Sequence, residues 1–277
     1  MIDYLKSSLR LIIVLLKRAR NNRNRAVIFS YFINNIIQKL FKKSGISKEI
    51  FLEMKDLNFW FSAGKSELSP YLEVCYNRIY ERSSFFIPGN EDVVFDIGGH
   101  IGFFTIRQAK RMNQGKIFVF EPNPYTFKRL LKNIKSNELK NVFPFNKAVT
   151  SRKGKTILFL SQESSEATTI MDKGTANNYT EKIEIGTISL DEIVKNYQIS
   201  KIHLMKIDVE GAEVEVLKSG LESALPLTEK IIIETHSYSL KEEVEKILDN
   251  LGFKIVLKIS SGKNALGENT LLYSSRN

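Results

Sequence analysis

The sequence contains few of the residues that build disulfide or zinc frameworks. Of its 277 residues, one is a cysteine, Cys75, and three are histidines. A single cysteine excludes an internal disulfide framework and favours a reducing compartment. No group of cysteines and histidines has the spacing of a structural zinc site. We therefore expect a cytoplasmic protein stabilised by a packed core, for which this length and a hydrophobic content of 43% suffice.

The N-terminal region lacks a hydrophobic run long enough to cross a membrane. The run LIIVLL at residues 11–16 is flanked by Arg10 and Lys17, whereas a spanning helix needs roughly 20 apolar residues. A cluster of basic residues follows this run in place of a small-residue cleavage site. A secretory signal is therefore not expected.

Positive charge is concentrated in the first 50 residues. This segment carries 11 Lys and Arg against two acidic residues, while the other 227 residues carry 30 basic and 29 acidic groups. We expect a basic, amphipathic helical extension over residues 1–50, built from LRLIIVLLKRAR and AVIFSYFINNIIQKLFKK. Two interpretations stay open. The helices lie in the interface of an acidic membrane, or they pack on the body of the protein.

From residue 93 the chain alternates between strand-like and helix-like segments. The strand-like runs are VVFDI, KIFVFE, VFPFN, IHLMKIDV, KIIIETH, KIVLKI and NTLLYS. The helix-like segments are 102–113, 124–137, 190–198, 212–220 and the run SLKEEVEKILDNLGF. Apolar strands joined by helical crossovers predict an α/β fold with a mostly parallel sheet covered on both faces.

Two segments interrupt this alternation. Residues 51–92 form a lead-in, in which FLEMKDLNFWF is predicted as one strand and the apolar spacing over residues 72–80 predicts a helix. Residues 151–188 hold short β-like pieces between Ser/Thr-rich turns, and we interpret them as an insertion near the strand ends that contacts substrate. The chain then divides into an extension over 1–50 and a domain over 51–277, whose core is 93–277.

A glycine-rich turn follows the first strand of the pattern and predicts a nucleotide-like ligand. In VVFDIGGHIGFFT the carboxylate of Asp96 precedes three glycines, which are Gly98, Gly99 and Gly102. Their spacing fits neither the phosphate loop nor the dinucleotide fingerprint. A carboxylate there repels a pyrophosphate but suits the sulfonium and ammonium cations of S-adenosylmethionine. Glu121, at the end of the next strand, is placed to accept hydrogen bonds from the ribose of NAD or S-adenosylmethionine alike.

Four segments together resemble the FkbM family of S-adenosylmethionine-dependent methyltransferases. They are VVFDIGGHIGFFT, VFEPNPYTFKRLLKNI, TISLDEIV and LMKIDVEGAEVEVLKSG, in the order of the family, and the resemblance covers roughly residues 90 to 257. It implies a methyltransferase domain over 51–277 with the class I, Rossmann-like fold, in which the sheet has seven strands and the last is antiparallel. Members that are understood mostly methylate hydroxyl groups of sugars or of natural products such as macrolides.

The resemblance also implies a set of residues for the cofactor, S-adenosylmethionine. The set is Asp96, Gly98 and Gly102 at the methionine end, Glu121 and Asn123 at the ribose, and Asn146 to Ala148 at the adenine. Where many members have Ala-Asn after the first glycine, this chain has Gly99-His100.

Acidic residues and a histidine stand at the ends of the fourth and fifth strands. The candidates are Asp208 and Glu210 in HLMKIDVEGAE, and Glu234 and His236 in IIIETHSY. If these strands are parallel neighbours, the four side chains converge near the glycine turn. Three interpretations stay open. His236 or Asp208 is a general base, the carboxylates and His236 hold a divalent metal, or the acidic groups form a structural ion network with Lys206.

These observations predict a methyltransferase that modifies a hydroxyl group of a sugar, a glycan or a glycosylated natural product. The predicted catalytic residues are Asp208, Glu210 and His236. We expect a small-molecule or glycan acceptor, peripheral membrane contact through residues 1–50, and no nucleic-acid partner. Two alternatives are an RNA methyltransferase anchored by its basic extension and a non-catalytic module that binds the cofactor.

Overall fold

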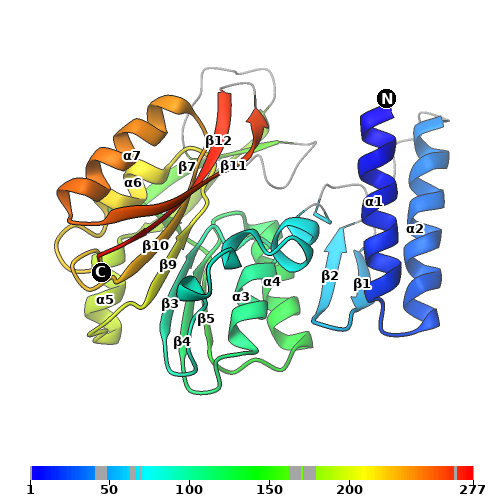
Figure 1. Ribbon diagram of the computed structural model, residues 1–277, viewed down its shortest axis with the longest axis horizontal. Coiled ribbons are helices and arrows are strands. Elements are labelled where there is room, and N and C mark those ends of the chain that lie inside the picture. The colour runs from blue at the N-terminus through cyan, green and yellow to red at the C-terminus, as the bar shows by residue number, and fades with distance from the viewer. Residues whose placement is uncertain are drawn as a thin grey trace.

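A seven-stranded sheet forms the centre of the computed structural model (Figure 1). The structure describes residues 2–40, 49–62, 67–68, 70–161, 170, 179–264 and 267–276. The strands of the sheet are β3 (Val93–Ile97), β4 (Lys116–Phe120), β5 (Val142–Phe145), β9 (Leu204–Ile207), β10 (Lys230–Thr235), β11 (Lys254–Asn264) and β12 (Gly267–Ser275). Their order is β11-β12-β10-β9-β3-β4-β5, and neighbours are parallel except where β12 is one of the pair. The predicted fold with an antiparallel last strand is confirmed.

Helices cover both faces of this sheet, as predicted. They are α3 (Phe103–Ala109), α4 (Pro124–Ser136), α5 (Leu190–Tyr197), α6 (Glu213–Lys218) and α7 (Tyr238–Asn250). Successive side chains of β3 point to opposite faces. Val94 is buried in a core with residues of α3, and Phe95 is buried in a second core with residues of α5, α6 and α7. A strand buried on both sides needs apolar residues nearly throughout, which explains the run VVFDI.

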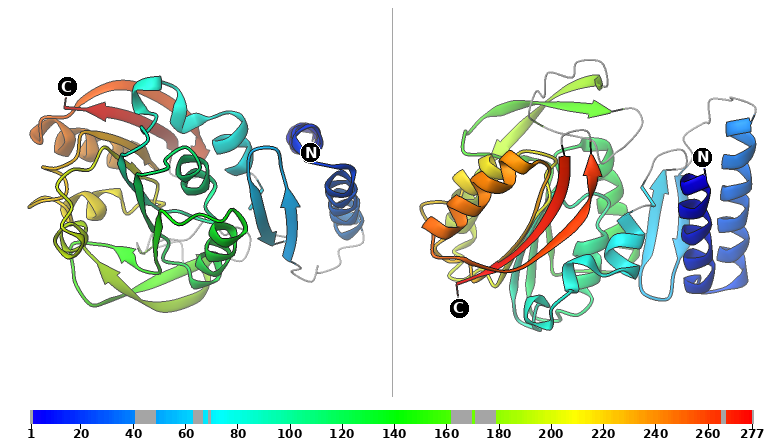
Figure 2. Two further views of the ribbon diagram at one scale, coloured as in Figure 1. Left: turned by 90° about the horizontal axis from the view of Figure 1, so that it is seen from below. Right: turned by 45° about the horizontal axis from the view of Figure 1, so that its top comes forward.

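Residues 151–188 contribute to a second, smaller sheet. It consists of β6 (Ala148–Val149), β7 (Lys155–Ser161) and β8 (Tyr179–Ile188), with β8 in the middle. Leu158 and Ile185 form a small core of their own with Ala148. Figure 2 shows that this sheet stands apart from the seven-stranded one.

The first part of the lead-in is a hairpin, and the prediction of a single strand over FLEMKDLNFWF is wrong. The hairpin consists of β1 (Glu49–Glu53) and β2 (Asn58–Ser62), which pair antiparallel. The chain reverses at Lys55 and Asp56, where the N–H of Met54 donates to the carbonyl of Leu57 at 3.2 Å. These two polar residues in the middle of an apolar run are the turn signal.

The second part of the lead-in contains two short turns of helix in place of the single helix predicted over residues 72–80. A π-helical turn spans Tyr71–Tyr76 and a 3₁₀ turn spans Ile79–Glu81. Between them Arg78 has a left-handed backbone, with φ of 53°. A left-handed residue cannot continue a right-handed helix, so the chain changes direction there.

The basic extension forms a helical hairpin that lies against β1 and β2 (Figure 2, left). Its helices are α1 (Ile2–Arg18) and α2 (Asn22–Leu40). Leu15 and Ile28 are buried in the same core as Phe59 of β2 and Ile106 of α3, so one side of the hairpin packs on the body of the protein. Among the described residues, no helix combines the length and the apolar character needed to cross a bilayer.

Asn133 of α4 fastens the lead-in to the main sheet. The residue is fully buried, and its Oδ1 accepts a hydrogen bond from the N–H of Trp60 at 2.6 Å. Its Nδ2 donates to the carbonyls of Trp60 and Ile101, at 3.2 and 2.8 Å. Trp60 belongs to β2 and Ile101 to the glycine turn after β3, so one amide joins three segments that are distant in the sequence.

Replacing Asn133 by alanine should therefore destabilise the fold. The substitution leaves buried backbone groups without partners, each at a cost of about 1–3 kcal/mol, and we expect the free energy of unfolding to fall by about 2–4 kcal/mol. Urea denaturation measures this change. Asn113→Ala is the matched control, because that residue is exposed and its loss should cost at most about 0.5 kcal/mol. Equal stability of the two variants would contradict the role of Asn133.

Candidate active site

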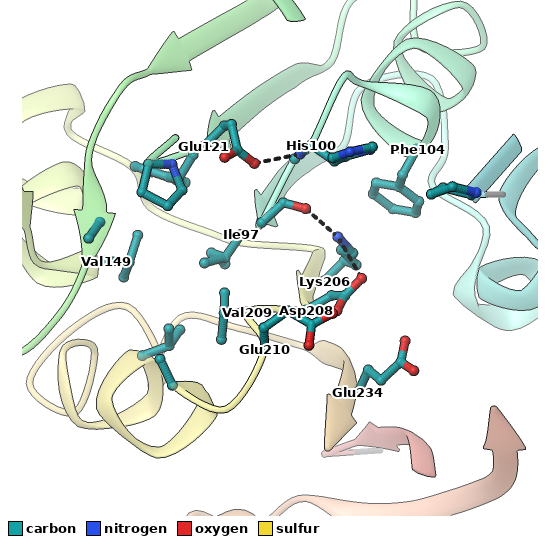
Figure 3. A pocket seen from close by; sticks show the side chains of 18 of the residues that line it. Ile97, His100, Phe104, Glu121, Val149, Lys206, Asp208, Val209, Glu210 and Glu234 are labelled. Carbon is teal, nitrogen blue, oxygen red and sulfur yellow. Dashed lines mark hydrogen bonds and ion pairs between the residues drawn. The ribbon is translucent and has the colours of Figure 1, made fainter. Parts of the chain in front are cut away.

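A cavity of about 240 Å³ opens where the parallel strands end. Its walls come from the segments that follow β3, β4, β9 and β10, from the lead-in, and from the small sheet. In Figure 3, Glu121 and His100 lie at one end of the cavity, and Asp208, Glu210 and Glu234 lie at the other. We call these the Glu121 end and the acidic end.

The glycine turn after β3 lies between the two ends. Gly98 has φ of 82°, and a Cβ there would stand 1.7 Å from the carbonyl oxygen of Asp208, so a side chain does not fit. The N–H groups of Gly98 and Gly99 both donate to the carbonyl of Phe120, at 3.0 and 2.9 Å. The turn is thereby packed against the segment after β9 on one side and against β4 on the other.

The structure does not bring Asp96 to the cavity. Its side chain is fully buried, and its carboxylate accepts a hydrogen bond from the hydroxyl of Thr105 in α3. Asp96 is the register partner of Lys206 on β9, and Lys206 Nζ lies 3.2 Å from Asp96 Oδ1. Asp96 is therefore not among the residues that line the cavity, and its contact with a cationic ligand stays a prediction. The alternation of β3 turns this side chain under α3, where Lys206 balances its charge.

Three other residues of the expected cofactor set brace loops and do not line the cavity. Asn123 caps α4, because its Oδ1 accepts hydrogen bonds from two backbone N–H groups of the first turn. Asn146 Nδ2 donates to the carbonyl of Glu121 at 2.9 Å. Gly102 lies against α4, where a Cβ would stand 2.7 Å from Leu130. The members of the expected set that line the cavity are Gly98, Glu121, Lys147 and Ala148.

Glu121 is buried, and its carboxylate group lies where β4 ends. Its Oε2 accepts a hydrogen bond from the N–H of His100 at 2.8 Å, and its Oε1 accepts one from the N–H of Asn123 at 2.9 Å. Burial raises the pKa of Glu121 to about 7 in spite of these bonds. Burial also lowers the pKa of His100 to about 3, so this ring is neutral. Each oxygen of Glu121 keeps capacity for one more donor, such as a ligand hydroxyl.

Asp208 is the best-connected carboxylate of the acidic end. Its Oδ2 accepts a hydrogen bond from the hydroxyl of Tyr80 at 2.9 Å and lies 3.7 Å from Lys206 Nζ. Lys206 also donates to the carbonyl of Gly98 at 2.8 Å. Burial acts to raise the pKa of Asp208, but Lys206 and His236 outweigh it and hold the pKa below its usual value. Asp208 is therefore an anion at neutral pH.

His236 stands among three carboxylates. Its Nδ1 lies 2.7 Å from Glu213 Oε1, and its Nε2 lies 3.6 Å from Glu210 Oε1 and 3.7 Å from Asp208 Oδ1. Burial acts to lower the pKa of His236, but the carboxylates raise it to about 10. In this arrangement the ring is protonated at neutral pH, so Nε2 gains a lone pair, for a general-base role or for a metal ion, only when that proton is lost.

The predicted convergence of the two strand ends is present, since Asp208, Glu210, Glu234 and His236 all line the cavity. The sequence analysis missed other wall residues, among them Glu73, Tyr80 and Asn269. Glu73 and Tyr80 lie in the lead-in, where apolar spacing alone gave no sign of a site. Glu213 was also missed as the partner of His236, although it stands in the quoted segment LMKIDVEGAEVEVLKSG.

Known proteins resemble this chain in sequence and in fold. Residues 96–255 match the FkbM methyltransferase domain. The hexuronic acid methyltransferase AglP of Haloferax volcanii is 35% identical over 159 residues, which span 57% of this chain and 62% of that protein. The 31-O-demethyl-FK506 methyltransferase FkbM of Streptomyces tacrolimicus is 26% identical over 223 residues, which span 70% of this chain and 84% of that protein.

A solved structure with the same fold is that of M. jannaschii TYW2 in complex with AdoMet. It superposes with a TM-score of 0.50 at 17% sequence identity, and the match covers 84% of this chain and 87% of that chain.

The raised pKa of Glu121 predicts that S-adenosylmethionine binds more weakly in mild acid. If ribose hydroxyls donate to this carboxylate, as the sequence analysis predicts, the anionic form binds, and with a pKa of about 7 the affinity should fall about tenfold between about pH 8 and about pH 6. Titration calorimetry over this range measures the change. Two charged groups also act on the pKa of Glu121: Lys206 lowers it and Asp96 raises it.

Glu121→Gln is the control that assigns this pH dependence. Burial of its carboxyl group at the cavity mouth raises the pKa of Glu73 to about 7, so a second group titrates in the same range. The E121Q variant should bind the cofactor weakly and with little change over these pH values. A variant that keeps the full pH dependence would exclude Glu121 as its source.

Proposed function

This chain belongs to the FkbM methyltransferase family, and we propose that it transfers the methyl group of S-adenosylmethionine to a hydroxyl group of a sugar or of a glycosylated natural product. The family and the fold are those of S-adenosylmethionine-dependent methyltransferases. In the proposed reaction the acceptor oxygen bonds to the methyl carbon while the carbon–sulfur bond breaks. The products are a methyl ether, S-adenosylhomocysteine and a proton that passes to solvent.

One observation carries this proposal: a single cavity joins a site suited to adenosine with a polar site suited to a hydroxyl group (Figure 3). At the Glu121 end, the Glu121 carboxylate meets the ribose and the apolar side chains of Val149, Leu158 and Ile170 border the adenine. Leu158 and Ile170 come from the insertion, for which the sequence analysis predicted contact with the substrate; in this proposal it borders the cofactor. At the acidic end, Asp208, Glu210 and His236 orient the acceptor oxygen, and positioning supplies much of the rate of such a displacement.

The charge of the acidic end favours a carbohydrate acceptor over RNA. Four carboxylates line it, from Glu73, Asp208, Glu210 and Glu234, against the single imidazolium of His236. Lys206 is already paired with Asp96. A nucleic-acid backbone would bring phosphates into this negative surface, which costs electrostatic energy in a partly desolvated site. The relatives AglP and FkbM, whose names describe acceptors that are not nucleic acids, support the same choice.

The test is methyl transfer by the purified full-length chain from methyl-labelled cofactor to a lysate of the native host. The labelled products are separated into carbohydrate, lipid, RNA and protein. We expect label in carbohydrate, attached as an ether that resists mild alkali. Label released by mild alkali indicates the methyl ester of a uronic acid and contradicts a hydroxyl acceptor. Label in RNA supports the RNA alternative, and cofactor binding without transfer to any fraction supports a non-catalytic module.

The hairpin of α1 and α2 suggests where the enzyme works. Its outer side exposes four large apolar side chains, namely Leu9 (57% exposed), Ile13 (43%), Phe29 (60%) and Ile33 (40%). The two members of each helix are four residues apart and therefore share a face. Arg25 Nε donates to the carbonyl of Leu16 at 3.3 Å, so the face of α2 that carries Arg25, Phe29 and Ile33 adjoins α1.

Exposed basic residues accompany these apolar side chains in the hairpin. They are Arg10, Lys17, Arg23 and Arg25 on the helices and Arg20 in the turn between them. Apolar and basic residues exposed together are typical of helices that lie in the interface of an acidic membrane. We therefore propose a cytoplasmic enzyme whose hairpin packs on the domain with one side and rests on the membrane with the other.

Substitution of Phe29 tests the membrane contact. Phe29→Glu should lower the affinity for vesicles of phosphatidylcholine and phosphatidylglycerol by about tenfold or more, because burying one phenyl ring contributes about 1.5–3 kcal/mol. Co-sedimentation measures the binding. Val256→Glu is the matched control, since Val256 is 55% exposed on β11 and lies outside the extension. If the two variants bind the vesicles equally well, the proposed contact is wrong.

A further inference from the structure

The geometry of the acidic end points to a metal site: we propose that Asp208, Glu210 and His236 bind a divalent cation of the Mg²⁺ or Mn²⁺ class. The proposal rests on the proposed function for the role of the ion, which is to hold the acceptor hydroxyl. The binding itself follows from the side chains described above and can be measured without any acceptor.

The three side chains present their donor atoms to one point. One atom from each lies within 4.8 Å of the other two, and His236 Nε2 is 3.6 Å from Glu210 Oε1 and 3.7 Å from Asp208 Oδ1. In an octahedral complex with bonds of roughly 2.1 Å, adjacent donors lie about 3 Å apart and opposite donors about 4.2 Å apart. Both measured distances to Nε2 lie between these two values, so the three side chains are close to the spacing that an ion requires.

Each of two ligands is held in place by an outer partner. Glu213 is fully buried and contacts Nδ1 of His236 at 2.7 Å, which directs Nε2 toward Asp208 and Glu210. Glu213 is itself fixed by the N–H of Gly211 at 2.9 Å. A carboxylate behind the far nitrogen of a histidine is the arrangement that orients metal-binding histidines.

Asp208 is held in the same way from the opposite side. Tyr80 donates to its Oδ2, and the other oxygen, Oδ1, is the one that faces His236 Nε2. A structural ion network would also direct Nε2 of His236 toward Asp208, but both side chains in addition line the cavity, where an ion can replace the Nε2 proton. The orientation of both ligands therefore favours an ion between them.

The donor set indicates the class of cation. Two carboxylates and one imidazole suit Mn²⁺ and Mg²⁺, which accept oxygen donors and keep further positions for water or substrate. Three protein ligands leave about three positions open in an octahedral complex, on the side of the cavity. A hydroxyl group bound there would have a lowered pKa and would face the methyl donor held at the glycine turn.

The test is direct binding of Mn²⁺ to the full-length protein after treatment with a chelator, followed by electron paramagnetic resonance. We expect one tight Mn²⁺ per chain. Glu210→Gln should weaken it at least about tenfold, and Glu213→Gln should weaken it about 10–100-fold although it removes no ligand. Glu73→Gln is the matched control, because it removes a carboxyl group from the same cavity but none of the three proposed ligands, and it should change the affinity less than about threefold.

Three results would overturn the metal site. They are wild-type protein that binds no Mn²⁺, E210Q and E213Q variants that bind it as the wild type does, and an E73Q variant that is weakened as much as E210Q. Far-ultraviolet circular dichroism and the thermal unfolding midpoint check that each variant is folded. If burial of Glu213 prevents E213Q from folding, Glu210, which is 33% exposed, carries the test alone. Protein that binds Mn²⁺ but transfers no methyl group would refute the proposed function and leave the metal site standing.

Discussion

The buried ammonium group of Lys206 holds the site together. It lies 3.2 Å from Asp96 and donates to the carbonyl of Gly98 at 2.8 Å, and it is 3.7 Å from Asp208. One side chain thus joins the strand before the glycine turn, the turn itself and the segment that carries the acidic end. Removing one partner from a buried ion pair typically costs about 3–5 kcal/mol, because the other charge is left without compensation. The main effect of the ion network around Lys206 is to fix one geometry of the glycine turn. Its contribution to the net free energy of folding is small, because burying the charges costs desolvation energy.

This network also determines which carboxylates produce the negative electrostatic potential in the cavity. Beneath the turn, the carboxylate of Asp96 forms an ion pair with Lys206 and accepts a hydrogen bond from the hydroxyl of Thr105. The negative potential that a sulfonium or a metal ion would experience comes from the other end of the cavity, through Asp208 and Glu210. In the proposed function, the carboxylates after β9 and β10 attract the cationic ligands, while Asp96 stabilises the glycine turn from below.

Much of this arrangement could be predicted from the sequence, because it follows from local periodicity. Strand and helix patterns placed Glu121, Asp208 and His236 at strand ends, and parallel strands end at one edge of a sheet. What the sequence could not give depends on packing between distant segments. Whether Asp96 faces a ligand or α3 is decided by what covers that face of β3. Tyr80 reaches Asp208 only because Arg78 adopts a left-handed backbone, which no apolar spacing indicates.

The shared core of the extension and the domain has a practical consequence. Leu15 and Ile28 are buried with Phe59, and β2 in turn is bound through Asn133 to the carbonyl of Ile101 in the glycine turn. A chain shortened to begin at β1 would expose that apolar surface to water near the glycine turn. The two N-terminal helices are thus part of the folding unit, and trimming them to improve solubility would have the opposite effect.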